Sequence, residues 1–223
     1  MSKGKLIVIE GLDSSGKETQ SKRLCEYLEQ KGEKVKRVEF PNYKSDSSAL
    51  VRMYLGGKFG DSPDCVNAYA ASTFFAADRY ATYKTDFEAF LNDGGIVVAD
   101  RYTTSNMIHQ ASKIDDAAER TAYLDWLDNF EYNLLGLPRP DKVIFLDMPM
   151  EIAQKLMAAR ANKIDGSEQK DIHERNKAYL EATYRAAAEV SEKYGWKHVL
   201  CGVDGQPLTI DKISEEVIKA AEV

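Results

Sequence analysis

The sequence predicts an α/β protein built on a sheet of about five parallel strands with helices on both faces. Three observations support this fold class. Short runs rich in Val, Ile, Leu and Phe recur along the chain, and each is almost continuously apolar, as strands buried on both faces are. The stretches between these runs are long enough for the crossover helices that parallel strands need. A chain of 223 residues, 43% of them hydrophobic, also has the size and composition of one α/β domain.

The strands are expected at residues 5–10, 35–40, 96–100, 142–147 and 198–203. After the first of them, Leu24, Tyr27 and Leu28 recur at helical spacing. They predict a helix over residues 19–31 that Gly32 ends. In doubly wound sheets of this kind, ligands bind beyond the C-terminal ends of the strands. The segments that follow the strands are therefore where a functional site is expected.

Composition narrows the classes of function. The 36 acidic residues outnumber the 30 basic ones, and a net charge of −6 disfavours broad binding to a nucleic-acid backbone. No stretch reaches the roughly 18 apolar residues of a membrane span, and the apolar run at residues 6–9 is too short for a signal peptide. Cys25, Cys65 and Cys201 are widely spaced, so we interpret them as reduced thiols. We therefore expect a cytoplasmic protein that binds neither nucleic acid nor membrane.

The turn after the first strand carries a phosphate-binding motif of the form G-x-x-x-x-G-K, from Gly11 to Lys17. Its two glycines permit backbone angles that turn several N–H groups inward, and the next helix presents its positive end to an anion. Lys17 adds a mobile charge for the outer phosphates. The motif predicts a nucleotide site made by Gly11, Leu12, Asp13, Ser14, Ser15, Gly16, Lys17, Glu18 and Thr19.

Glu18 departs from the usual motif, in which Ser or Thr follows the lysine and holds Mg²⁺. The hydroxyl comes one residue later, at Thr19. Because one residue turns a helix by about 100°, the two side chains cannot point the same way. Either Glu18 contacts Mg²⁺ or its waters, or it faces outward and the metal is held elsewhere. We favour a contact through water.

Two later strands end in a carboxylate, at Asp100 and at Asp147. Each would lie at the edge of the sheet that carries the phosphate loop, where it could hold Mg²⁺. The apolar pattern alone does not choose between them. Arg101 favours Asp100, because phosphoryl transfer needs positive charge near the moving group. Asp100 and Glu18 are therefore the candidate metal ligands.

Taken in order, these segments resemble the thymidylate kinase family of P-loop nucleoside monophosphate kinases. The phosphate loop alone does not distinguish between kinases, but its combination with four further segments is specific. The matching segments are residues 8–13 with 16–20, Phe40-Pro41, residues 74–80, residues 100–102 with Ser105, Asn106 and Gln110, and residues 137–141 with 145–149.

The resemblance implies a P-loop NTPase fold, a three-layer sandwich with a five-stranded parallel sheet, in a single domain over residues 1–223. It also implies that the γ-phosphoryl group of ATP passes to dTMP, with Mg²⁺, to form dTDP for dTTP synthesis. A homodimer would form through helices that include the one near residues 74–84. A polar segment at about residues 160–171 occupies the place of the family's mobile lid over the donor phosphates, and Arg160 is the lid residue that we expect to act.

The resemblance also implies roles for single residues. Lys17, Arg101, Asp100 and Arg160 would be catalytic. The acceptor nucleotide would be bound by Asp13, Phe40, Tyr43, Phe75, Arg79, Arg101, Tyr102, Asn106 and Gln110.

Within that set, Asp13 would bond the sugar 3′-hydroxyl, Phe75 would stack on thymine and Tyr102 would pack against the sugar. Arg79 would contact the base or the acceptor phosphate. Asn106 and Gln110 would read the edge of the base. Without the resemblance, an aromatic residue such as Phe75 is better explained by a core position, and Arg79 could form a surface salt bridge. A loop at residues 203–207 either borders the adenine or is a simple turn.

Tyr43 is a second departure, since the family's F-P loop usually continues to an arginine that clamps the acceptor phosphate. Lys44 is adjacent to it, and Arg52 lies farther along. A tyrosine donates one hydrogen bond where arginine makes a two-pronged contact. Two alternatives therefore stay open: a kinase with a different nucleotide or nucleoside acceptor, and a non-catalytic P-loop switch, to which Glu18 lends slight support.

Overall fold

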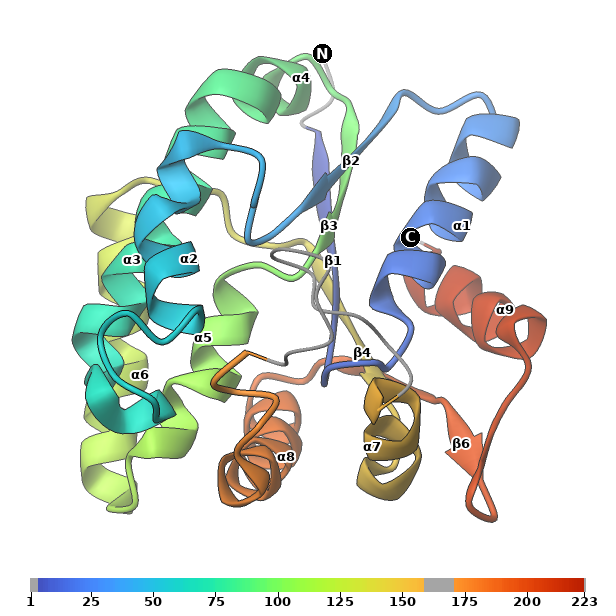
Figure 1. Ribbon diagram of the computed structural model, residues 1–223. Helices are drawn as coiled ribbons and strands as arrows, with labels where there is room; N and C mark the ends of the chain where they lie inside the picture. Colours follow the sequence, from blue (N-terminus) through green and yellow to red (C-terminus); the bar gives the residue numbers. More distant parts are fainter. Residues whose placement is uncertain (1–3, 159–170, 223) are drawn as a thin grey trace.

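The computed structural model describes residues 4–158 and 171–222. Five parallel strands form its sheet in the order β2-β3-β1-β4-β5, so the strand that precedes the phosphate loop lies in the centre (Figure 1). This sheet confirms the predicted fold class. The strands are β1 (Lys5–Gly11), β2 (Val35–Glu39), β3 (Ile96–Asp100), β4 (Lys142–Asp147) and β5 (Lys197–Leu200).

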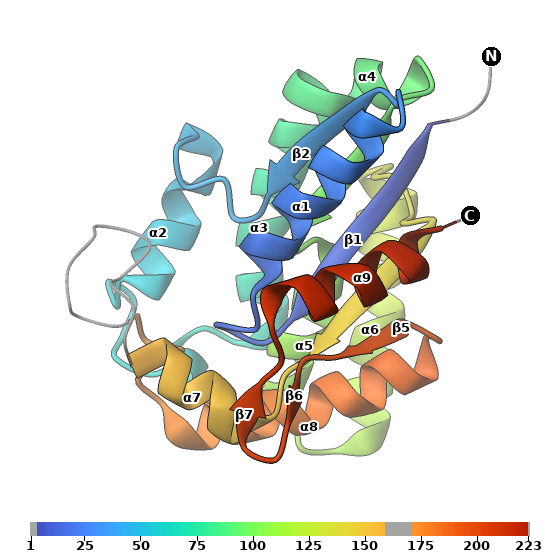
Figure 2. The ribbon, with the colours of Figure 1, turned by 90° about the vertical axis from the view of Figure 1, so that its right-hand side faces the viewer.

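Helices cover both faces of the sheet. Figure 2 shows α1 and α9 packed together on one face, and an apolar cluster that includes Ile9, Leu24 and Val217 lies beneath them. The helices α3 to α6 and α8 lie on the other side. The helix bounds are α1 (Lys17–Gln30), α2 (Ala49–Leu55), α3 (Ala68–Thr82), α4 (Glu88–Asn92), α5 (Thr103–His109), α6 (Ala117–Asp128), α7 (Met150–Ala158), α8 (Lys177–Lys193) and α9 (Ile210–Ala221).

Short helical turns complete these elements. Two π-helical turns, η3 (Tyr83–Phe87) and η5 (Asn129–Leu134), extend α3 and α6. Three 3₁₀ turns are η1 (Asp46–Ser48), η2 (Pro63–Cys65) and η4 (Ala111–Lys113). Within the described residues, none of the helices has the length and apolar character that crossing a membrane requires.

The last strand differs from the prediction of one run over residues 198–203. The backbone leaves the sheet at Cys201, whose N–H still donates to the carbonyl of Asp147. Residues beyond it form a separate antiparallel ribbon of β6 (Gly202–Val203) and β7 (Gln206–Pro207). The ribbon turns through Asp204 and Gly205, which both have positive φ angles. An apolar run thus predicted the strand but not the point at which its pairing ends.

The register brings three strand ends to one edge. Ile9 lies beside Asp100, and Gly11 lies beside Leu146, the residue before Asp147. The loops that follow β1, β3 and β4 therefore leave the sheet side by side, as the parallel order requires. This edge carries the candidate site.

Candidate active site

The phosphate loop is closed by glycine at both ends. Gly11 has a φ of 153°, and a Cβ there would lie 2.9 Å from the carbonyl oxygen of Leu146. Gly16 has a φ of 92° and is the residue at which α1 begins. The hydroxyl oxygens of Ser14 and Ser15 are buried and have no hydrogen-bond partner among the described residues. Free donors at a helix N-terminus suit an anion.

Lys17 is buried at the base of this loop. Its Nζ donates to the carbonyl of Leu12 at 2.6 Å. Burial, and then repulsion by Arg101, lower the pKa of Lys17 from 10.5 to about 7, although Asp13, Asp100 and Glu10 oppose the shift. A polyphosphate beside the ammonium group would favour its charged form again. A bound polyphosphate would thus provide the negative charge that pairs with the Lys17 ammonium group.

One hollow beside the loop suits a nucleoside triphosphate. The residues Ser14 to Gln20 form its polar wall. Its other wall is largely apolar and contains Met148, Leu156, Pro207, Leu208, Ile210 and Ile213. Pro207 belongs to the loop at residues 203–207, which the sequence left either as a border of the adenine or as a simple turn. Its position on this wall favours the first interpretation.

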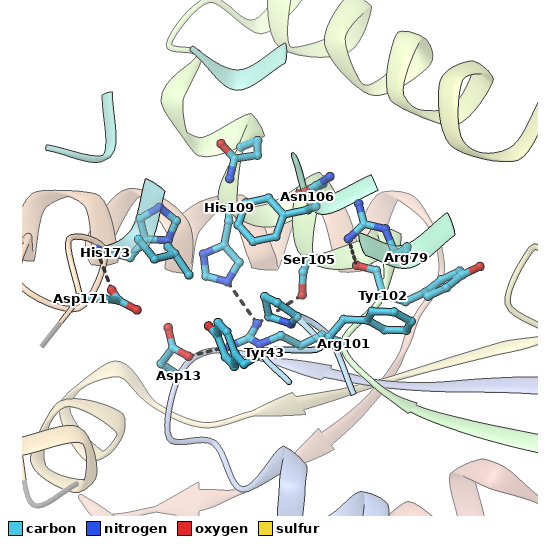
Figure 3. A pocket seen from close by; sticks show the side chains of 15 residues that line it. Asp13, Tyr43, Arg79, Arg101, Tyr102, Ser105, Asn106, His109, Asp171 and His173 are labelled. Carbon is cyan, nitrogen blue, oxygen red and sulfur yellow. Dashed lines mark hydrogen bonds and ion pairs between the residues drawn. The ribbon is translucent and has the colours of Figure 1, made fainter. Parts of the chain in front are cut away.

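A second hollow, on the other side of Asp13, holds the residues expected to bind the acceptor (Figure 3). The structure brings all nine together, although they come from segments far apart in the chain. Ser105, His109, Asp171 and His173 also line this hollow. The nine are Asp13, Phe40, Tyr43, Phe75, Arg79, Arg101, Tyr102, Asn106 and Gln110.

Arg101 lies beside Asp13, where the acceptor hollow adjoins the phosphate loop. Its Nη2 donates to Asp13 Oδ1 at 2.6 Å, and its Nη1 lies 3.4 Å from Glu10 Oε1 and 3.2 Å from His109 Nε2. The backbone φ angle of Arg101 is 67°, which is unusual for a residue other than glycine. The guanidinium is therefore held from three sides at the junction where charge would move.

Glu10 is a residue that sequence reasoning missed. It is fully buried, and one carboxylate oxygen accepts from the hydroxyls of Thr104 at 2.7 Å and Ser105 at 2.8 Å. The other accepts from the N–H of Gly11 at 2.9 Å and faces Arg101. Glu10 thereby ties the phosphate loop to the start of α5. The signal was present in the sequence, because Glu10 comes directly after an apolar run, as Asp100 and Asp147 do.

Aromatic and amide groups form the other end of the acceptor hollow. Phe75 is half-buried and lines it, whereas Phe74 packs against Phe59 with ring centres 5.8 Å apart. Both amide atoms of Gln110 are buried and have no partner among the described residues, as expected of a group that meets a ligand. Arg79 is buried in an ion pair with Glu131, which excludes the surface salt bridge weighed for it.

Tyr102 and Phe40 line the hollow from its core side. Their ring centres are 5.8 Å apart, and Tyr102 donates its hydroxyl to the carbonyl of Pro138 at 3.1 Å. The side chain of Tyr102 is thus buried with its hydroxyl group already engaged. Packing of Tyr102 against the sugar stays a prediction.

Tyr43 occupies the position at which the family pattern has an arginine, and two basic residues, Lys44 and Arg52, are nearby. Tyr43 lines both the acceptor hollow and the adjoining hollow that contains Lys44. Arg52 does not take the place of the arginine. Its Nη1 donates to the carbonyls of Tyr43 and Ser45 at 2.9 and 2.8 Å, so it stabilises the loop from behind. Contact of Tyr43 with an acceptor phosphate stays a prediction, and Lys44 lies beside it.

Two histidines in the acceptor hollow were also missed by sequence reasoning. The rings of His109 and His173 are stacked with centres 6.0 Å apart, and the hydroxyl of Tyr179 lies near both. Burial and the charge of Arg101 lower the pKa of His109 to about 3, and burial lowers that of His173 well below its usual value. His109 is therefore neutral near pH 7 and accepts a hydrogen bond from Arg101.

Asp171 stands at the mouth of the same hollow. Its Oδ1 accepts the backbone N–H groups of His173 and Glu174 at 2.8 and 2.9 Å. Burial, and then the charge of Asp13, raise the pKa of Asp171 to about 7. The carboxyl is therefore largely neutral at pH 6 and largely charged at pH 8. Its charge would oppose a phosphate group nearby.

Asp171→Asn is expected to change the pH dependence of acceptor binding. At pH 8 the wild-type carboxylate repels the acceptor phosphate, so the variant should show a KM for the acceptor about fivefold lower than wild type. At pH 6 the carboxyl is already neutral, and the two proteins should agree. Steady-state kinetics at both pH values measures this, with KM for ATP as the internal control. If the ratio of the variant's KM for the acceptor to the wild-type KM were the same at both pH values, the titration of Asp171 would be contradicted.

Glu18 and Asp100 line a common hollow with Asp13 and Tyr43. Glu18 pairs with Lys22 one turn along α1 at 2.7 Å, and Asp100 is buried, with Arg37 Nη2 at 3.3 Å. Asp147, the alternative, lies 3.7 Å from His198 Nδ1 and does not line this hollow. Among residues 4–158 and 171–222, no cluster of three metal-ligating side chains is preformed. Two carboxylates near a phosphate loop suit Mg²⁺, which keeps waters and shares phosphate oxygens.

Arg160, the expected lid residue, lies outside the described residues, as does all of the segment 160–171 except Asp171. Its catalytic role stays a prediction.

Comparison with known proteins was made for the whole chain. The family model for thymidylate kinase matches residues 9–200. A thymidylate kinase from Mycobacterium tuberculosis H37Rv is 30% identical over 204 residues, which cover 91% of this chain and 93% of the relative. Human thymidylate kinase is 31% identical over 153 residues, covering 69% and 65%. A solved thymidylate kinase from Candida albicans, described as having broad substrate specificity, superposes with a TM-score of 0.71 at 25% identity, covering 98% and 92%.

Proposed function

Because this chain belongs to the thymidylate kinase family, we propose that the site described above transfers the γ-phosphoryl group of ATP to dTMP, with Mg²⁺, and forms dTDP and ADP. Phosphorylation of dTMP with ATP is the reaction of the family, and dTDP leads towards dTTP. The present proposal assigns that reaction to particular residues. ATP would lie on the phosphate loop with its γ-phosphate near Lys17, and dTMP would lie in the hollow lined by Phe75 and Arg101.

The observation that carries the proposal is that the acceptor hollow adjoins the phosphate loop at Asp13. Asp13 belongs to the phosphate loop and also lines the acceptor hollow, and Arg101 bonds it from the far side at 2.6 Å. Arg101 is close enough to Lys17 to lower its pKa. Two phosphate groups bound in the two hollows would therefore meet between these cations, which is the arrangement that phosphoryl transfer requires.

The chemistry at this junction is alignment and charge neutralisation. The acceptor is already an anionic phosphate, so its oxygen attacks without a strong general base. Arg101 neutralises charge on the group in transit, and Lys17 neutralises charge on the ATP phosphates. Asp13 would accept a hydrogen bond from the 3′-hydroxyl of the sugar, and Tyr43 would donate one to the acceptor phosphate. Arg160 in the lid would complete the positive charge and exclude water, which would otherwise hydrolyse ATP.

Mg²⁺ fits the carboxylates at this edge of the sheet. Asp100 would hold the ion, directly or through water, and Glu18 would contact its water shell. Bound there, Mg²⁺ would offset the negative charge of the phosphates. Glu18 would have to exchange its exposed pair with Lys22 for this contact, which costs little because exposed ion pairs are weak.

A panel of acceptors tests the proposed function. ADP release is measured with ATP and Mg²⁺, in turn with dTMP, dUMP, dCMP, dGMP, AMP and thymidine. We expect dTMP to give the highest kcat/KM. Another acceptor with the highest value would establish the alternative kinase that Tyr43 leaves open. No acceptor-stimulated ADP release with any of them would establish the non-catalytic switch.

Phe75→Ala is expected to raise KM for dTMP about tenfold and leave KM for ATP unchanged, because stacking a base on an aromatic ring contributes roughly 1–3 kcal/mol. Phe74→Ala is the matched control. It removes a neighbouring aromatic ring of the same helix that packs on Phe59 and does not line the hollow. Stacking would be contradicted if Phe75→Ala changed KM for dTMP and KM for ATP equally. It would also be contradicted if Phe74→Ala raised KM for dTMP alone.

The proposal includes a cytoplasmic homodimer that forms through α3. Tyr69 and Tyr80 on this helix are both more than 40% exposed, which suits a surface that a second copy covers. Light scattering coupled to size-exclusion chromatography measures the mass. A mass of one chain at micromolar concentration would contradict the dimer without affecting the proposed reaction.

A further inference from the structure

Glu131 is a fully buried carboxylate that the reaction described above does not use. It lies in the π-helical turn η5, after α6, and it has no place among the residues that line the acceptor hollow. Nevertheless, three side chains from α3 and α5 converge on it. Arg79 donates to it twice, Thr103 donates its hydroxyl at 3.0 Å, and Asn106 donates its side-chain amide at 3.2 Å.

These contacts fix which end of Arg79 is available to a ligand. Nε and Nη2 of Arg79 bond the two oxygens of Glu131 at 2.6 and 2.5 Å, which is a two-pronged contact between planar groups. The remaining nitrogen, Nη1, lies 3.4 Å from the carbonyl of Tyr102, at the long limit of a hydrogen bond. Arg79 lines the acceptor hollow, so it offers this N–H donor there.

The same carboxylate fixes the orientation of the Asn106 amide. Nδ2 of Asn106 donates to Glu131 Oε1 at 3.2 Å and to the carbonyl of Ser72 at 3.3 Å. A carboxylate and a carbonyl only accept hydrogen bonds, so a flipped amide would place its oxygen against two other acceptors. Both protons of Nδ2 are thus engaged. The atom that Asn106 can offer in the hollow is its carbonyl oxygen, an acceptor.

We infer that Glu131 is the positioning residue that sets base specificity, by making Arg79 present a donor and Asn106 an acceptor to the same edge of the acceptor's base. This inference rests on the proposed function, because it concerns the nucleotide that the kinase accepts. It adds a residue that touches no substrate. Figure 3 shows the side chains of Arg79 and Asn106 on the same side of the hollow, away from Asp13 and Asp171.

A donor beside an acceptor matches one class of pyrimidine. Thymine and uracil carry an acceptor at O4 and a donor at N3–H, so they complement Arg79 and Asn106. Cytosine carries a donor at the 4-amino group and an acceptor at N3, so both contacts would set like groups against each other. A site built to make such hydrogen bonds rejects the mismatched ligand strongly, because its own buried groups are left unpaired. Glu131 therefore selects 4-oxo over 4-amino pyrimidines.

Glu131→Gln tests this inference, since glutamine has nearly the same shape but replaces one acceptor oxygen by a donor NH₂. The glutamine NH₂ then faces an N–H donor of Arg79 or Asn106, so one hydrogen bond is lost. The side-chain amide of Asn106 is then free to flip. We expect the ratio of kcat/KM for dTMP to that for dCMP to fall about tenfold or more, mainly through a higher KM for dTMP. KM for ATP should stay within about twofold of wild type.

Thr103→Val is the matched control. Thr103 is buried and bonds the same carboxylate at 3.0 Å, but it does not line the hollow. It should lower the melting temperature and leave the dTMP-to-dCMP ratio unchanged. A Glu131→Gln variant that keeps the wild-type ratio, or that loses activity equally with both acceptors, would overturn the inference.

The wild-type protein provides a second readout that does not depend on a folded variant or on catalysis. In an NMR spectrum with ¹⁵N-labelled asparagine, the side-chain NH₂ protons of Asn106 should exchange slowly with solvent, because both are bonded and buried. Rapid exchange of these protons in the folded wild type would contradict the inference. If instead no nucleoside monophosphate stimulates ADP release by the wild type, the proposed function fails, and the NH₂ exchange still reports on Glu131 by itself.

Discussion

Lys17→Ala is expected to lower kcat by a factor of about 100 or more while the protein stays folded. In the wild type the Lys17 ammonium is buried at the base of the phosphate loop and donates a hydrogen bond to the carbonyl of Leu12. In the proposed reaction this charge would stabilise the phosphates of the leaving ADP, which gain negative charge as the γ-phosphoryl group departs. Alanine leaves the backbone N–H groups of the loop in place but removes that charge, so ATP would still bind and turnover would fall.

Stability supplies an independent check of the same variant. The pKa of Lys17 is about 7 in the folded chain and 10.5 in the reference state, so folding releases a proton between these pH values. Below pH 7 the buried charge opposes folding in full, and this cost falls as the pH rises towards 10.5. Lys17→Ala should therefore keep or raise the melting temperature at pH 7. Lys22→Ala, on the exposed face of the same helix, should change neither property. Turnover near that of wild type for Lys17→Ala would contradict the assignment of the loop.

Arg101→Ala is expected to have the second large effect, a loss of about 1,000-fold in kcat/KM for dTMP. The guanidinium is held by Asp13, Glu10 and His109 where the acceptor hollow adjoins the phosphate loop, so it would act on the transferred group without first having to be ordered. Arg101→Lys should recover little of the activity, because one ammonium cannot bridge these three partners.

Two further measurements separate catalysis by Arg101 from a structural role. Arg101→Ala leaves the carboxylates of Glu10 and Asp13 without this cation, so circular dichroism and the melting temperature must show that the variant is folded at the assay temperature. Arg120→Ala is the control, since Arg120 pairs with Glu189 on the surface at 3.3 Å. If folded Arg101→Ala kept a tenth or more of the wild-type kcat/KM, the role at the junction would be wrong.

Much of the fold followed from local pattern. The β1, β3 and β4 strands contain short, almost continuous runs of apolar residues, and such runs can be recognised within a short window of sequence. The phosphate loop was predictable for the same reason, since its glycines, its lysine and the helix that follows lie within a few residues. The helix after the first strand begins at Lys17 and not at residue 19, because Gly16 in the left-handed conformation already starts it.

The parts that could not be predicted depend on long-range convergence. Glu131 lies 52 residues after Arg79 and 25 after Asn106, yet one carboxylate bonds both. His173 comes 64 residues after His109, and their rings stack because the segment before α8 lies beside α5, against which α8 packs. A charged or polar residue inside an apolar stretch predicts that some partner exists, but not which one. Only the tertiary packing supplies that information.

The most direct test of the account is a crystal structure of the protein with dTMP and a non-hydrolysable ATP analogue in the presence of Mg²⁺. We predict that the γ-phosphate lies between Lys17 and Arg101, that the 5′-phosphate of dTMP lies near Tyr43 and Arg101, and that thymine lies on Phe75. Asn106 should face N3 of the base with its oxygen. The account is contradicted if the triphosphate binds away from residues 11–17, or if dTMP at millimolar concentration leaves the hollow between Asp13 and Arg79 unfilled.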